Sequence, residues 1–143
     1  MSEAKEINLS LLQDLSKQLA KNEYKGYQFS CLPIHGQQEV LRVEVSGLEE
    51  IPIFMTVTEN QILCISYLFT KKEIYSKKEA DLNKYLLELN VPMPLSSFAL
   101  VDDNYTIFGS LACGSKFESI TQELILLAKN STDTLQALEE FIK

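Results

Sequence analysis

The spacing of the hydrophobic residues changes near Gly26, and this change limits the folds open to the chain. Before Gly26, leucines recur every three or four residues, which predicts an amphipathic helix that begins with Asn8 as its cap. The leucines of this helix are Leu9, Leu12, Leu15 and Leu19. After Gly26, apolar residues alternate with polar ones, as in antiparallel strands with one face on the core and one in water. We therefore expect a helix followed by a meander of strands.

Four strands are predicted between residues 27 and 69. The first two alternate in polarity, and Pro33 to Gln38 form the loop between them. Their apolar positions are Tyr27, Phe29 and Cys31, then Leu41, Val43 and Val45. The next two, Ile51 to Val57 and Gln61 to Phe69, are apolar on both faces for part of their length. Such strands are typical of the centre of a sheet that is covered on both sides.

Two pairs with capping-box spacing, Ser76 with Glu79 and Ser115 with Glu118, predict the starts of two further helices. In a capping box, each side chain accepts a hydrogen bond from the other residue's backbone N–H. The first of these helices should stop at Pro92, because proline cannot continue a helix.

The rest of the C-terminal half predicts a strand hairpin and a helical end. Phe98 to Val101 and Tyr105 to Ala112 form the hairpin, with turn-forming residues between them. The helix after the hairpin should end at Asn130, and Thr132 to Ile142 should form a shorter fourth helix.

The predicted order is one helix, four strands, one helix, two strands and one or two helices. Runs of antiparallel strands flanked by helices predict a two-layer α+β fold, with an antiparallel sheet and helices on one face. At 143 residues the chain has the length of one domain, so we expect a single α+β domain over residues 1–143.

The charge of the chain disfavours nucleic acid as a partner. Its net charge is −7, from 20 acidic and 13 basic residues, and Arg42 is the only arginine. Nucleic-acid binders normally carry a basic stripe. Residues 1–6 are polar and no apolar stretch reaches the length of a membrane span, so we expect a cytoplasmic protein without membrane insertion. Reduced thiols are expected at Cys31, Cys64 and Cys113.

Candidate chemistry is scarce, and we predict no enzyme, no cofactor and no metal site. His35 is the only histidine and there is no C-x-x-C pair, so neither a nucleophile with its base nor a zinc cluster can be assembled. The acidic pairs Glu49–Glu50 and Asp102–Asp103 fall where turns are expected. The segment from Gly109 to Gly114 lacks the lysine of a phosphate-binding loop, so Gly109 is interpreted as a bulge or a close-packing site.

One basic cluster stands out in the acidic chain, between the fourth strand and the second helix. It allows two interpretations, a docking patch for an acidic partner or a solvated helix entrance. The residues predicted as partner contacts are Phe69, Lys71, Lys72, Tyr75, Lys77 and Lys78.

The segments Pro94 to Phe98 and Tyr105 to Leu111, with Glu123 in an apolar helix, resemble the signature region of the YjfI-like bacterial proteins, a family without assigned function. The first ninety residues agree with that family in element order and length. The order of elements also resembles the fold of type III secretion chaperones and YbjN-like proteins, which are acidic, catalytically silent and often dimeric. The YjfI-like resemblance implies a PspA-like membrane-stress coat protein as partner.

These features predict a non-catalytic adaptor or chaperone-like protein that binds a protein partner and forms a homodimer. The alternative is a small-molecule sensor or an unrecognised enzyme with a carboxylate-lined pocket.

Overall fold

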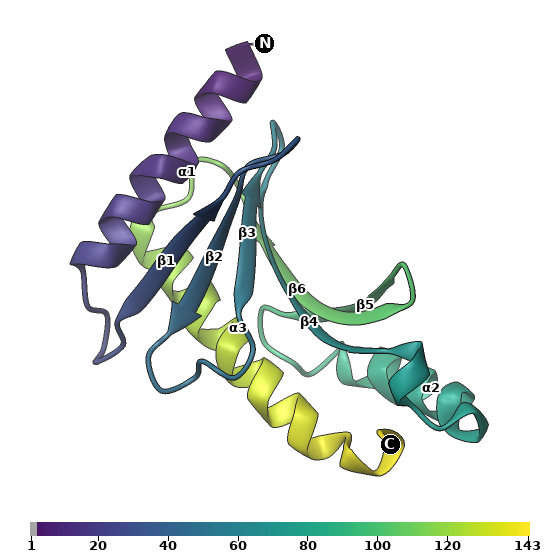
Figure 1. Cartoon of the computed structure of the whole chain (residues 1–143). Helices are drawn as coiled ribbons and strands as arrows, with labels where there is room; N and C mark the ends of the chain where they lie inside the picture. The colour runs from purple at the N-terminus through teal and green to yellow at the C-terminus, as the bar shows by residue number, and fades with distance from the viewer. Residues whose placement is uncertain (1–2) are drawn as a thin grey trace.

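The computed structural model describes residues 3–143, which form a six-stranded sheet with helices on one side (Figure 1). Its strands are β1 (Phe29–Ile34), β2 (Val40–Val45), β3 (Ile53–Val57), β4 (Ile62–Thr70), β5 (Ser97–Val101) and β6 (Asn104–Leu111). Its α-helices are α1 (Glu3–Lys21), α2 (Glu79–Leu89) and α3 (Phe117–Ala137), and its short 3-10 helices are η1 (Lys71–Glu73), η2 (Ser76–Lys78) and η3 (Glu139–Phe141). The α+β class and the predicted order of elements are confirmed.

Helix α1 covers the first three strands of the sheet. Its buried residues are Leu12, Leu15 and Leu19, which belong to the leucine face predicted from the sequence. The helix already includes Glu3, so Asn8 lies inside it and the predicted cap at Asn8 is wrong. At the C-terminal end, the side-chain amide of Asn22 donates a hydrogen bond to the Gln18 carbonyl at 2.7 Å.

All neighbouring strands are antiparallel, in the order β1-β2-β3-β4-β6-β5. β1 to β4 form the predicted meander, although β1 continues to Ile34 and takes in Pro33, where a loop was expected. β6 lies between β4 and β5, because the segment containing α2 carries the chain from the end of β4 to the edge of the sheet. A β-bulge interrupts the pairing of β4 with β6 between Tyr67 and Phe69.

The main core lies between the sheet and the two longest helices. α1 packs on β1 to β3, and α3 crosses the same face from β2 to β6 (Figure 1). Alternate residues of each strand point into this core, including Val43, Met55, Cys64 and Ile107, each of which is fully buried.

A second hydrophobic cluster joins α2 and the C-terminal segment to the ends of β4 and β6. Its buried members are Phe69, Ile74, Leu82, Leu86, Tyr105, Leu138 and Phe141. Backbone bonds fasten the C-terminal segment here, since the Tyr75 N–H donates to the Phe141 carbonyl at 3.1 Å and the Lys143 N–H to the Glu73 carbonyl at 2.7 Å.

Neither predicted capping box forms. Ser76 starts η2, α2 begins only at Glu79, and neither α2 nor α3 has a side-chain cap. A related bond occurs earlier in the chain, where the Thr70 N–H donates to Glu73 Oε1 at 3.0 Å.

Helix α3 continues through Asn130 to Ala137, so the predicted helix end at Asn130 is wrong. The fourth helix expected from Thr132 to Ile142 is instead the last part of α3 followed by η3.

β3 and β4 occupy the two central positions of the sheet, as expected for strands that are apolar on both faces. They are covered on one face only. No helix among residues 3–143 packs on the opposite face, so the expected double covering is wrong. The same described residues include no helix long and apolar enough to cross a membrane.

Candidate functional site

The uncovered side of the sheet, which we call the open face, is largely apolar. The register places one side chain from each of five strands directly opposite the next, in a central row made of Leu32, Arg42, Phe54, Ile65 and Phe108. Other apolar or aromatic residues of the open face are Ile34, Val40, Leu63, Tyr67, Ala99 and Val101. Polar residues share this face, among them Glu44, Thr56 and Ser110. An exposed apolar surface of this kind is typical of an interaction site.

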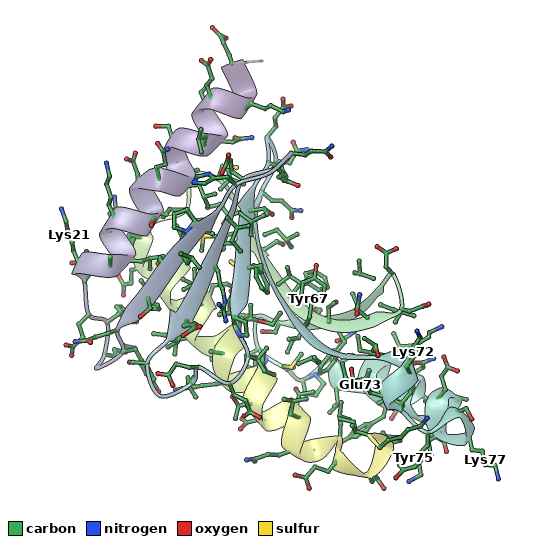
Figure 2. All side chains as sticks on the ribbon, viewed as in Figure 1. Lys21, Tyr67, Lys72, Glu73, Tyr75 and Lys77 are labelled. Atoms are coloured by element: carbon green, nitrogen blue, oxygen red, sulfur yellow. The ribbon has the colours of Figure 1, made fainter. Side chains whose placement is uncertain are left out.

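Leu32 and Tyr67 are the most exposed of the large apolar side chains on the open face. Leu32 is 56% exposed and Tyr67 is 47% exposed. The Tyr67 ring lies edge-on to the ring of Phe54, with 5.9 Å between the ring centroids. Figure 2 shows Tyr67 on the side of β4 away from α1 and α3. Large rings held against the sheet offer a partner hydrophobic area at little entropic cost.

Arg42 occupies the second position of the central row, between Leu32 and Phe54. Its Nη2 atom lies 3.1 Å from Oε1 of Glu44, two residues along the same strand. Its Nε atom is shielded from solvent and has no acceptor within the described part of the chain. A shielded donor without an acceptor costs free energy, on the order of 1–3 kcal/mol.

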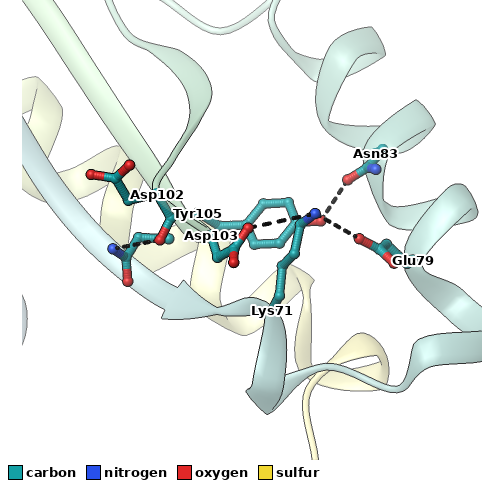
Figure 3. A network of polar contacts seen from close by, with 7 residues as sticks. Lys71, Glu79, Asn83, Asp102, Asp103 and Tyr105 are labelled. Atoms are coloured by element: carbon teal, nitrogen blue, oxygen red, sulfur yellow. Dashed lines mark hydrogen bonds and ion pairs between the residues drawn. The ribbon is translucent and has the colours of Figure 1, made fainter.

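Of the six residues predicted as partner contacts, only Phe69 is buried. Lys71 belongs to a polar network (Figure 3), with its Nζ atom 3.4 Å from Oε1 of Glu79 and 3.8 Å from Oδ1 of Asp103. The contact with Glu79 raises the pKa of Lys71. In the same network, the Tyr105 hydroxyl donates to Asn83 Oδ1 at 2.7 Å.

Phe69 is buried in the second cluster, where its ring stacks on Tyr105 with 5.1 Å between centroids. Phe69 therefore presents almost no surface, and a partner contact through it stays a prediction. Lys78 donates from Nζ to the Glu140 carbonyl at 2.6 Å, close above the Tyr75 ring. Lys72, Tyr75 and Lys77 lie on the surface (Figure 2), so a partner contact there stays a prediction.

Glu123 is a buried carboxylic acid that sequence reasoning noticed only through the family resemblance. It packs directly on the backbone of Gly109, where an added Cβ atom would overlap the carboxyl group. Its Oε1 atom has no hydrogen-bond partner among the described residues, and burial raises the pKa of Glu123 to about 7. Burial, and secondarily the charge of Glu123, raises the pKa of the neighbouring Cys64 thiol to about 12. Gly109 is therefore a close-packing site.

The other candidate groups from the sequence are His35, a metal site and a carboxylate-lined pocket. His35 Nδ1 lies 2.6 Å from Glu39 Oε2 at the exposed tip of the β1–β2 hairpin. No group of three metal-binding side chains gathers within residues 3–143. A groove of about 490 Å³ beside α1 is lined by Glu39 and Glu59, but it is open to solvent, so the carboxylate-lined pocket stays a prediction.

Residues 10–142 match the family model described as "Uncharacterized protein conserved in bacteria (DUF2170)". A comparison with curated proteins gives no match. Among solved structures, YbjN from E. coli is similar, with a TM-score of 0.62, 14% identity, and coverage of 94% of this chain and 96% of that one.

Two complexes from the same comparison contain chains with this fold. One is the HopA1–SchA chaperone–effector complex, with a TM-score of 0.58, 13% identity, and coverage of 93% of this chain and 96% of the matched one. The other is the ExoU–SpcU heterodimer of the Pseudomonas aeruginosa type III secretion system, with a TM-score of 0.53, 14% identity, and coverage of 89% and 93%. At these identities the similarity is one of fold, and it confirms the predicted resemblance to secretion chaperones and YbjN.

Proposed function

The chain belongs to the DUF2170 family of uncharacterised bacterial proteins, and we propose that it is a non-catalytic adaptor that binds a segment of another protein on its open face. The observation that carries this proposal is the central row, in which Leu32, Phe54, Ile65 and Phe108 form an apolar surface without a covering helix. Apolar side chains on both faces of a central strand usually indicate that both faces are covered. In this protein the second covering layer comes from the partner.

The similar structures support the proposal. One is a complex of a chaperone with an effector and another is a heterodimer of a secretion system, so chains with this fold do bind protein partners. Fold alone does not fix function, which is why the argument starts from the surface of this chain.

The remaining parts of the proposal concern context. We place the protein in the cytoplasm as a homodimer and assign it to the YjfI-like group within its family. We take a PspA-like membrane-stress protein as the first partner to test, because the YjfI-like resemblance implies it.

Site-specific cross-linking in host cells tests the proposed surface. A photo-reactive phenylalanine analogue replaces Tyr67 on the open face, Tyr75 in the basic cluster, or Lys21 at the end of α1 (Figure 2). We expect position 67 to yield one discrete cross-linked protein and position 21 to yield none. The cross-linked protein is then identified by mass spectrometry, which also tests the PspA-like assignment.

A matched pair of charge substitutions provides the control. Leu32→Glu places a charge on the open face, whereas Ile7→Glu places one on the exposed side of α1, and both positions are more than half exposed, at 56% and 66%. Leu32→Glu should lower the cross-linking yield from position 67 by roughly tenfold or more, and Ile7→Glu should leave it unchanged. Cross-linking from position 75 alone, or equal yields in both variants, would contradict the proposed surface.

A further inference from the structure

We propose that the segment bound on the open face places an acidic side chain over Arg42, between apolar side chains that cover Leu32 and Phe54. This inference rests on the proposed function and adds the chemistry of the partner. It starts from the composition of the open face, where Arg42 is the only basic residue that the strand register places.

The position of Arg42 makes it a recognition element. The side chain is 39% exposed while its Nε atom is shielded, so the exposed area belongs to the other atoms of the side chain. Arginine carries five N–H donors, and here the interaction with Glu44 involves Nη2. Donors of the guanidinium therefore remain for an acceptor that arrives from the open side.

A carboxylate fits this position better than a neutral acceptor does. Apolar side chains on both sides of Arg42 exclude water once a partner covers the row. Glu44 already balances the charge of Arg42 through Nη2, but guanidinium donors left without an acceptor would then be buried. A carboxylate can accept from these donors, and charge-assisted hydrogen bonds are about twice as strong as neutral ones.

Other occupants of the face fit less well. Nucleic acid and anionic lipid surfaces are disfavoured by the net charge of −7. A segment of another protein, with one acidic residue among apolar ones, meets both the apolar and the charged requirement.

Selection from a displayed library of random short peptides tests the inference without knowledge of the natural partner. Selections run in parallel on the wild-type protein, on Arg42→Met, which keeps an unbranched apolar stem, and on Leu32→Glu. We expect wild type to enrich peptides with Asp or Glu at a fixed position between apolar residues. Arg42→Met should keep the apolar preference and lose the acidic one. A synthetic peptide from the selection should bind Arg42→Met about tenfold more weakly than wild type, and its Glu→Gln counterpart should bind both equally.

The outcomes separate this inference from the proposed function. In one outcome, wild type enriches apolar peptides that have no acidic position, while Leu32→Glu enriches none. That result would overturn the role of Arg42 and leave the open face as the binding surface. Enrichment that is identical on wild type and Leu32→Glu, or no enrichment at all, would overturn both. Concentration-dependent dimerisation that Leu32→Glu abolishes would assign the face to a second copy and also overturn the inference. Thermal unfolding of each variant shows that it is folded.

Discussion

At the scale of single residues, the most unusual feature is the contact between Glu123 and Gly109. The carboxyl group occupies the space that a side chain at position 109 would need, and the Leu95 carbonyl lies 3.0 Å from the same point. Pro94 to Phe98, Gly109 and Glu123 all belong to the segments that carry the family resemblance. The structure brings them together, and it explains why the sequence has a glycine in the middle of a strand.

Stability should fall as the pH rises, because the folded protein holds the Glu123 proton more tightly than the unfolded chain does. Burial raises the pKa of Glu123 from 4.5 to about 7, so its contribution is complete below about pH 4.5 and is lost as the pH rises towards and through 7. The pKa difference between the folded and unfolded states corresponds to a loss of unfolding free energy on the order of 3 kcal/mol. Urea unfolding between about pH 5 and pH 8 measures it in wild type and in Glu123→Gln.

Glu123→Gln is the control, because glutamine keeps the shape of the glutamate side chain and cannot ionise. We expect the free energy of unfolding of wild type minus that of the variant to decline across this pH range. Cys64, the neighbouring thiol, does not titrate there because its pKa is raised to about 12. Parallel pH profiles for the two proteins would show that Glu123 is not the group responsible.

At the scale of elements, α3 shows how tertiary contacts override local helix-end signals. Asn130, Ser131 and Thr132 together are typical of a helix end, yet the helix continues for two more turns. Two of these residues bond backwards within the helix, Ser131 Oγ to the Leu127 carbonyl at 2.7 Å and Thr132 Oγ1 to the Ala128 carbonyl at 3.1 Å. Continuation carries Leu138 and Phe141 into the second cluster, which more than offsets the weak local propensity.

Asn130 instead binds the connector between α2 and β5. Its side-chain amide donates to the Pro94 carbonyl at 3.1 Å and to Ser96 Oγ at 3.0 Å. Asn130→Ala should therefore lower the free energy of unfolding by about 1–2 kcal/mol. The loss of the two hydrogen bonds destabilises the fold, and the higher helix propensity of alanine offsets part of that loss. Hydrogen exchange should become faster between residues 91 and 98.

Thr132→Ala serves as the matched substitution, because the Thr132 hydroxyl donates to the Ala128 carbonyl of its own helix. We expect it to change stability little and to leave exchange in the connector as in wild type. If the two variants behave alike in urea unfolding and in exchange, Asn130 does not anchor the connector.

At the scale of the whole molecule, the periodicity of the sequence predicted the class and order of elements because each element has its own local pattern. It did not place β6 between β4 and β5, since that pairing joins residues far apart in the chain. It also could not show that Phe54 and Ile65 lie on an uncovered face. A strand face that is covered by a helix of the same chain and one that is covered by another protein have the same apolar pattern. Arg42 was noticed only as the single arginine, because its neighbours in the central row come from other strands.

The two hydrophobic clusters raise the question of whether the chain unfolds as one unit, as the expected single domain requires. β4, β6 and α3 contribute to both clusters, so we predict that loosening one also loosens the other. Val43→Ala in the main core and Leu82→Ala in the second cluster remove buried atoms from positions with no exposed area. Each should shift one common thermal transition, with Leu82→Ala costing about 2–5 kcal/mol.

Calorimetry of wild type and both variants provides the measurement, with circular dichroism as a second probe. A single transition, whose calorimetric and van't Hoff enthalpies agree, is expected in all three proteins. If Leu82→Ala instead splits the transition and moves only its first part, α2 and the C-terminal segment form a separately unfolding unit. The sheet with α1 and most of α3 would then keep the open face intact without them, because the central row contains no residue of the second cluster. Partner binding by Leu82→Ala, measured at a temperature between its two transitions, would show whether the open face stays folded after the second cluster has unfolded.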